Sequence, residues 1–108
     1  MHHLRLQAQW LYLRGTNVVV QNSAGTETLA SFTENGGAVF YYDNSAKIAT
    51  DTNGIAVAGN VDMPDGAKVL LGDSDDLKLY HDASNSYIED SGTGGLKLLT
   101  TQLLLKNA

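Results

Sequence analysis

The chain has 108 residues, of which 12 are acidic and 7 are basic, so its formal net charge is −5. This length suits one small domain or a few turns of a fibre, and it excludes a large multidomain protein. The negative charge is the wrong sign for a surface that follows phosphates, so we expect no nucleic-acid partner. Without cysteine there is neither a disulfide framework nor a thiolate metal site. No apolar run approaches the roughly 18 residues of a membrane span, and we expect no signal peptide in the opening residues.

Short apolar runs, separated by clusters of Gly, Asn, Asp, Ser and Thr, follow one another along the chain. Each run is about the length of a strand, and several alternate apolar with polar residues. The runs that predict strands are, in chain order, 18–20, 38–42, 55–57, 69–71, 77–80 and 96–98. Their short spacing is typical of an all-β sandwich, barrel or solenoid, and helix is a minority expectation.

The two ends of the chain match each other without a gap when the sequence is shifted by 92 residues. Both basic positions stay basic, and four leucines coincide. The matched pairs are Leu4 with Leu96, Leu6 with Leu98, Leu11 with Leu103, and Leu13 with Leu105. Leucines two positions apart favour a strand over a helix, on which such side chains point away from each other. We therefore predict a single repetitive β module over 1–108, about one 92-residue repeat unit with matching ends at 4–16 and 96–108.

A weaker internal similarity relates the two halves of the chain. The segment 41–45 lies over 80–84, and with one-residue slips Ile48 falls on Ile88 and Ile55 on Leu96. Each half then predicts a strand, an Asp turn, a short strand, a glycine turn and a third strand. We interpret this similarity as a half-repeat of about 40 residues.

Acidic residues gather between positions 73 and 90, and oxygen-rich clusters are typical of calcium sites. Asp73, Asp75 and Asp76 are the metal-ligand candidates. An EF-hand loop places its third oxygen ligand where this chain has Leu77, so the pattern does not match. We favour solvated turn acids, with no metal and no cofactor, and keep a calcium-binding module as an alternative.

Among the acids between positions 73 and 90, Asp82, Glu89 and Asp90 would provide an acid and base pair for cleaving glycosidic bonds if the fold brings two of these carboxylates within about 5 to 10 Å. Acids are common in the turns and strand ends of β proteins, so we expect the chain not to be an enzyme. A glycan-cleaving activity is the least favoured alternative. His81 matches no known triad spacing and is not assigned a role.

Tyrosines gather around the two predicted Asp turns: Tyr41, Tyr42, Tyr80 and Tyr87. Exposed tyrosine rings stack on sugars, which makes these four residues the candidate glycan contacts. The favoured alternative is that some of them form packed pairs across neighbouring strands.

The order of several short segments resembles repeats in tail-fibre-like structural proteins of marine bacteriophages, including cyanophages. The segments that carry the resemblance are 32–36 (FTENG), 39–47 (VFYYDNSAK), 72–82 (GDSDDLKLYHD), 84–88 (SNSYI) and 92–94 (GTG). The resemblance covers nearly the entire chain from about Leu4 onward, although the family has glycine where this chain has Ala83, a residue that resists positive φ. It implies a repetitive β-rich fibre component, commonly an intertwined homotrimer, and carries no catalytic residue.

We therefore expect a structural fibre module of a virion or extracellular filament, built as a β-solenoid or an intertwined trimeric β-fibre. Its expected partner is the same chain, as a homotrimer or an end-to-end filament, because a thin chain of short strands must cover its apolar faces and edges. The eight matched leucines are the expected assembly residues, and a host-surface glycan is a further expected contact. The alternative is a monomeric β-sandwich that binds calcium or carbohydrate.

Overall fold

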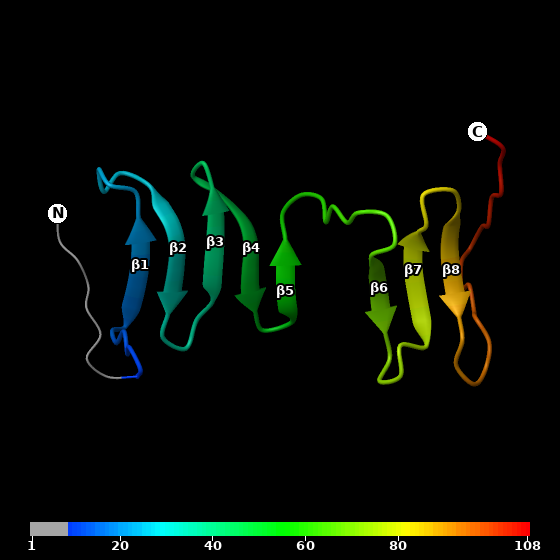
Figure 1. Cartoon of the computed structure of the whole chain (residues 1–108), viewed down its shortest axis with the longest axis horizontal. Coiled ribbons are helices and arrows are strands. Elements are labelled where there is room, and N and C mark those ends of the chain that lie inside the picture. Colours follow the sequence, from blue (N-terminus) through cyan, green and yellow to red (C-terminus); the bar gives the residue numbers. More distant parts are fainter. Residues whose placement is uncertain (1–8) are drawn as a thin grey trace. The chain divides into compact units, whose positions relative to one another are not determined.

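The computed structural model describes residues 9–108, and all their regular structure is β-strand (Figure 1). Within this range there is no helix that is long and apolar enough to cross a membrane. The chain divides into two compact units, at Val61 and Asp62. The all-β prediction is confirmed, and the described residues show neither a closed barrel nor a solenoid. Whether 1–108 is a single repeat unit stays a prediction.

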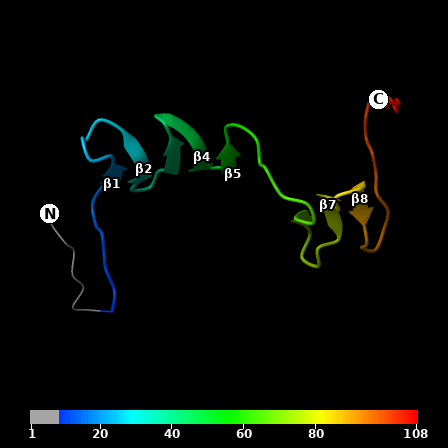
Figure 2. The same cartoon turned by 45° about the horizontal axis from the view of Figure 1, so that its top comes forward.

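The first unit holds one five-stranded antiparallel sheet, in which every strand pairs with its neighbours in the sequence. Its strands are β1 (Asn17–Gln21), β2 (Thr28–Thr33), β3 (Ala38–Tyr42), β4 (Ser45–Asp51) and β5 (Gly54–Val57). Both views show them side by side in one layer (Figures 1 and 2). The runs at 18–20, 38–42 and 55–57 are confirmed as strands, whereas β2 was missed.

Turn residues suited to left-handed backbone close the hairpins of this sheet. Asp43 and Asn44 alone link β3 to β4, with φ of 45° and 64°. Two positive φ values are what a type I′ hairpin turn needs, and Asp and Asn adopt them more readily than most residues. In the β4–β5 turn, Asp51 Oδ1 accepts the backbone N–H groups of Asn53 at 2.7 Å and Gly54 at 3.0 Å. The sequence therefore sets the register of these hairpins locally.

The β2–β3 turn lies against the far end of β4. A Cβ atom built on Gly37 would lie 2.5 Å from the backbone oxygen of Thr50, so only glycine fits there without a shift of the backbone. Thr50 Oγ1 also accepts the N–H of Ala38 at 2.9 Å. This contact fastens the start of β3 to β4.

The second unit holds a three-stranded antiparallel sheet. Its strands are β6 (Lys68–Leu71), β7 (Leu77–His81) and β8 (Ser86–Asp90). The predicted strands at 69–71 and 77–80 are confirmed. The four-residue β7–β8 loop places Ala83 at a φ of 81°, in the left-handed region that disfavours a side chain. This loop thus has alanine in a conformation that favours glycine.

Neither unit encloses a core of its own. Among the described residues, Ala30 at 9% exposure is the only hydrophobic residue that is buried, whereas Phe40 is 50% exposed.

Strands are absent from the described parts of the two matched ends, which corrects the prediction made there. The run 96–98 forms no strand, and neither does 11–13, although apolar residues alternate in both. Residues 93–108 make no backbone–backbone hydrogen bond with any other described residue. A strand exists only with a hydrogen-bonded partner, and in the described residues neither segment pairs with an edge strand of either sheet. The matching segment at 4–6 lies outside the described residues.

Candidate functional site

The second unit gathers polar and aromatic side chains on one face of its sheet. Alternation along the strands places Lys78 and Tyr80 of β7 on the same face as Tyr87 and Glu89 of β8, since Lys78 pairs with Glu89 and Tyr80 with Tyr87. Lys68 of β6 pairs with Tyr80 from the other side. Side-chain contacts link these five residues, so we call them the polar face.

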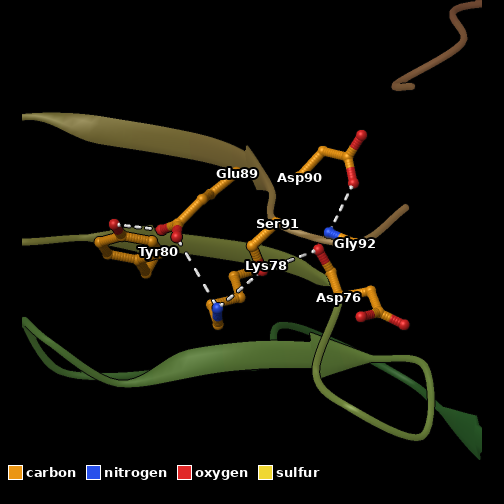
Figure 3. Close-up of polar contacts among 7 residues, drawn as sticks. All are labelled: Asp76, Lys78, Tyr80, Glu89, Asp90, Ser91 and Gly92. Carbon is orange, nitrogen blue, oxygen red and sulfur yellow. Dashed lines mark hydrogen bonds and ion pairs between the residues drawn. The ribbon is translucent and has the colours of Figure 1, made fainter. Parts of the chain in front are cut away.

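Glu89 contacts two other residues of the polar face, Tyr80 and Lys78 (Figure 3). Its Oε2 accepts a hydrogen bond from the Tyr80 hydroxyl at 2.7 Å, and its Oε1 lies 3.7 Å from Lys78 Nζ. Lys78 Nζ also donates to Ser91 Oγ at 3.2 Å, and the Ser91 N–H donates to the carbonyl of Asp76 at 2.8 Å. This chain of contacts joins β7, β8 and the loop between β6 and β7.

Two tyrosine rings stack on each other on this face. The centroids of Tyr80 and Tyr87 are 4.7 Å apart, and their planes are inclined by 16°. Lys68 Nζ lies 4.7 Å from the centroid of the Tyr80 ring, within cation–π distance. Because both neighbours use the Tyr80 ring, the cross-strand alternative describes this pair, and Tyr80 has little ring surface left for a sugar.

The hydrogen bond between Tyr80 and Glu89 changes how both groups titrate. It raises the pKa of Tyr80 to about 12, helped by desolvation and by the negative charge of Glu89. The same hydrogen bond, with the nearby Lys78 and Lys68 charges, lowers the pKa of Glu89 against a smaller opposing desolvation. Glu89 is therefore held as a carboxylate that accepts hydrogen bonds.

Asp82 closes the β7–β8 loop. Its Oδ1 accepts the backbone N–H groups of Asn85 at 2.7 Å and Ser84 at 2.9 Å, and its Oδ2 accepts the Tyr87 hydroxyl at 2.9 Å. These three bonds lower the pKa of Asp82, the two to the backbone most. The carboxylate acts as a turn cap.

Two of the three acids proposed for glycan cleavage, Asp82 and Glu89, are carboxylates that accept hydrogen bonds from tyrosine hydroxyls. A general acid in this reaction needs a raised pKa, whereas the pKa values of Asp82 and Glu89 are both lowered. Alternation along β8 places Asp90 on the face opposite Glu89, and its Oδ1 accepts the Gly92 N–H at 3.3 Å (Figure 3). All three carboxylates thus serve local structure.

His81 and Ser86 form a cross-strand pair that the sequence spacing did not reveal. His81 Nδ1 lies 2.9 Å from Ser86 Oγ, and the two residues are register partners on β7 and β8. Among the described residues, no carboxylate forms a hydrogen bond with the His81 ring. A nucleophile and its base need a third group that orients the base, so this pair lacks a catalytic arrangement.

The three candidate metal ligands lie in or beside the β6–β7 loop. Across residues 9–108 there is no group of three or more His, Asp or Glu residues placed to hold a metal ion. Asp76 packs against Gly92 instead, where a built Cβ would lie 2.9 Å from the Asp76 Cβ. Asp73 and Asp75 are exposed. The loop therefore joins the polar face through the Asp76 backbone and gathers no ligand set.

Tyr41 and Tyr42 lie in the first unit, on consecutive positions of β3 and hence on opposite faces. Tyr42 is 74% exposed and Tyr41 is half-buried. The structure therefore brings together only two of the four candidate glycan tyrosines, Tyr80 and Tyr87.

The described members of the eight assembly leucines all lie in segments without strands. They are exposed: Leu11, Leu13, Leu96, Leu98, Leu103 and Leu105. Leu4 and Leu6 lie outside the described residues. The exposure of Leu105 reaches 88%, which leaves its side chain almost wholly in water.

The first unit also has an open cleft at one end of its sheet, about 410 Å³ in volume. Its lining residues come from the β2–β3 and β4–β5 turns and the end of β4: Asn35, Gly36, Gly37, Thr50, Asp51 and Thr52. Asp51 is the only ionisable residue among them, and its carboxylate already caps the turn. The cleft holds no further group suited to chemistry.

No protein-family model, no curated protein and no solved structure matches this chain.

Sequence reasoning missed two features of the second unit, the roles of Lys68 and Lys78. Both lysines alternate with leucine or valine in their strands, and their positions opposite Tyr80 and Glu89 depend on the strand register. The turn lengths that fix this register were the signal available in the sequence.

Proposed function

We propose that the chain is a structural fibre module that works by associating with copies of itself, as a homotrimer or an end-to-end filament. The tail-fibre setting, in a virion or outside the cell, follows from the sequence resemblance. The observation that carries the proposal is the lack of a closed core, because Ala30 is the only buried hydrophobic residue in the described range. Apolar surface left open on this scale is typical of chains that are completed by association.

The C-terminal segment supports the same proposal. Leu99 is 91% exposed, and residues 93–108 form no backbone–backbone hydrogen bond with any described residue. An unpaired extended backbone is a ready template for another chain, and leucines add apolar surface to it. Since this segment matches the start of the repeat unit, heterologous contacts between successive copies would grow a filament.

The alternatives lack a comparable observation. The candidate calcium ligands do not converge, and the acids considered for glycan cleavage are hydrogen-bonded acceptors with lowered pKa values. A host glycan remains a proposed secondary contact through Tyr42 or Tyr87, whose rings are partly exposed.

Light-scattering mass and negative-stain electron microscopy of the purified chain test the proposal. We expect rods or filaments and a mass that is a multiple of 11.5 kDa, three chains for the trimer. A monodisperse particle of 11.5 kDa at the highest soluble concentration would overturn it.

A pair of variants tests the assembly leucines. In Leu98→Lys combined with Leu105→Lys, two charges replace apolar side chains at matched repeat positions, and we expect shorter filaments or smaller oligomers. Thr101→Lys adds a charge to the same segment without removing a leucine, and it serves as the control. Equal assembly of both proteins would remove the matched ends from the proposal.

A further inference from the structure

Two asparagines of the chain, Asn35 and Asn53, are followed directly by glycine. In such a pair the backbone nitrogen of the glycine can attack the side-chain amide carbon of the asparagine, because glycine has no side chain to hinder the approach. Both asparagines are exposed in hairpin turns, Asn35 between β2 and β3 and Asn53 between β4 and β5. The surroundings of the two pairs differ, and this difference decides which of them can deamidate in the folded chain.

The glycine that follows Asn35 is confined by its neighbours. A Cβ built on Gly36 would lie 3.0 Å from Thr33 Cγ2, and the Gly36 N–H donates to the Thr33 carbonyl at 2.9 Å. The next residue, Gly37, lies against the backbone oxygen of Thr50 in β4. Rotation of the backbone at Gly36 would therefore disturb the end of β2 and, through Gly37, also β4.

The glycine that follows Asn53 has open space around it. Apart from its chain neighbours, no atom lies within 4 Å of a Cβ built on Gly54. The turn leads into β5, an edge strand that pairs only with β4, and pairing at the edge of a sheet opens more readily than pairing in its middle. The Asn53 side chain forms no hydrogen bond with any described residue, so its amide can turn toward the backbone.

One contact opposes the reaction at Asn53. Asp51 Oδ1 accepts the N–H groups of Asn53 at 2.7 Å and Gly54 at 3.0 Å. Attack requires the Gly54 nitrogen to lose its proton and to turn toward the asparagine side chain, whereas a carboxylate that accepts this N–H holds both the proton and the orientation. Because the acceptor is an exposed side chain, it can rotate away without a change in the backbone.

We infer that Asn53 is the deamidation site of the folded chain and that the Asp51 carboxylate slows the reaction there. The Gly54 nitrogen loses its proton to solvent and forms a bond to Asn53 Cγ, and the side-chain nitrogen takes up a proton and leaves as ammonia. Water then opens the five-membered imide at either carbonyl, which gives aspartate or isoaspartate. Water is the only co-reactant. This inference goes beyond the proposed function and does not depend on it.

The products change both the charge and the turn. Either product adds one negative charge to a chain whose net charge is −5. Isoaspartate also places an extra carbon in the backbone before Gly54, so the turn no longer brings Asp51 and Gly54 into register. We therefore expect β5 to lose protection from hydrogen exchange as the isoaspartate form accumulates.

Peptide mass spectrometry of aged protein tests the site. Folded protein is kept in mildly alkaline buffer, and the acid and amide forms at positions 35 and 53 are followed over time. We expect Asn53 to convert at least fivefold faster than Asn35. In a strong denaturant the two pairs are expected to react at similar rates, because each is then an unprotected Asn–Gly pair. Equal rates in the folded protein, or faster conversion of Asn35, would overturn the inference.

Two variants test the role of Asp51. Asp51→Ala removes the acceptor, and we expect Asn53 to convert at least threefold faster in the folded protein while Asn35 keeps its rate. Asp51→Asn keeps an oxygen acceptor without the charge and should give an intermediate rate. Hydrogen exchange of β5 separates a released N–H from a lost hairpin. An unchanged rate in Asp51→Ala, or a faster rate that comes with loss of protection throughout β5, would overturn the role of the carboxylate.

Discussion

The five-stranded sheet has its side-chain hydrogen bonds in turns and at strand ends, whereas the three-stranded sheet has, besides the Asp82 turn cap, side-chain hydrogen bonds that cross its strands. In the first unit, Asn22, Thr50 and Asp51 accept backbone N–H groups near the loops. In the second, Tyr80 and Glu89 join the middles of β7 and β8. The comparison teaches that turns alone can define the register of a single-layer sheet, and that side-chain pairs across the strands can be added to them.

This difference predicts separate weak points for the two sheets. The larger sheet should be most sensitive where a turn meets a strand, and the smaller one where a cross-strand polar pair changes its charge. Hydrogen exchange resolved by peptide distinguishes the sheets in one experiment, because each variant is expected to loosen only its own sheet.

The largest effect is expected for Gly37→Ala. The new Cβ would lie 2.5 Å from the Thr50 oxygen, and overpacking of this kind costs about 2 kcal/mol. We expect faster exchange in β2, β3 and β4, with β7 and β8 unchanged. Gly95→Ala is the control, since a Cβ there meets nothing within 4 Å. Equal loss of protection in both variants would contradict the close approach.

Acid is expected to loosen the three-stranded sheet. The pKa values of Glu89 and Asp82 are lowered in the folded chain, so their contribution to stability is complete above their ordinary pKa values, near 4. It is lost as the pH falls through the lowered values. Exchange of β7 and β8 should therefore rise below about pH 4, and less so in Tyr80→Phe, which lacks the hydrogen bond to Glu89.

The hydrogen-bonded pair of Tyr80 and Glu89 also makes stability depend on pH in the alkaline range. The pKa of Tyr80 is about 12, so this group stabilises the fold fully below pH 10 and loses that contribution as the pH rises to about 12. Glu89→Gln removes the charge that holds the proton, and the Tyr80 ring, followed by NMR, should then titrate closer to 10. An unchanged titration in Glu89→Gln would assign the shift to another cause.

The smallest effect is expected for Ala83→Gly. Alanine at a φ of 81° is strained, and glycine removes that strain but has a more flexible unfolded state, so the net gain is about 0.5 kcal/mol. We expect a slightly higher melting temperature of the second unit. Ser84→Gly, at the next position and without positive φ, should lower it. A loss of stability in Ala83→Gly would mean that the loop tolerates alanine without strain.

The sequence predicted strands well where apolar residues run together, as in β3 and β7. It missed β2, whose residues TLASFT mix small, polar and apolar side chains, although this strand contains the buried Ala30. Burial of Ala30 depends on Val20 and Phe40 beside it, and that pairing is set by the turns on either side of β2, not by the residues of the strand itself.

The half-repeat held for two strands and failed at the third. Ile48 and Ile88 both lie in the second strand of a hairpin that begins after an Asp turn, as predicted. Ile55 lies in β5, but its counterpart Leu96 lies outside any strand. The turns also differ, with two residues after Tyr42 and four after His81. Local patterns predict a hairpin, whereas a third strand forms only where the segment pairs with the edge of that hairpin, and Leu96 does not pair with β8.

The contacts of the polar face could not be predicted from the sequence, because they depend on the register in which the strands pair. The acids were visible as a cluster, but the partners that lower the pKa of Glu89 come from β6 and β7. Only the register shows that Lys78 lies opposite Glu89 and that Asp90 lies on the other face.

Every strand of both sheets pairs with its nearest neighbour in the sequence, and this bears on how the chain folds. The widest register pair, Asn17 with Thr33, spans 16 residues, so each hairpin closes a short loop. Sheets with such local contacts form faster than those whose strands come from distant parts of the chain. A nascent chain can therefore complete one hairpin after another as it leaves the ribosome, and only the contacts between copies must wait for an encounter in solution.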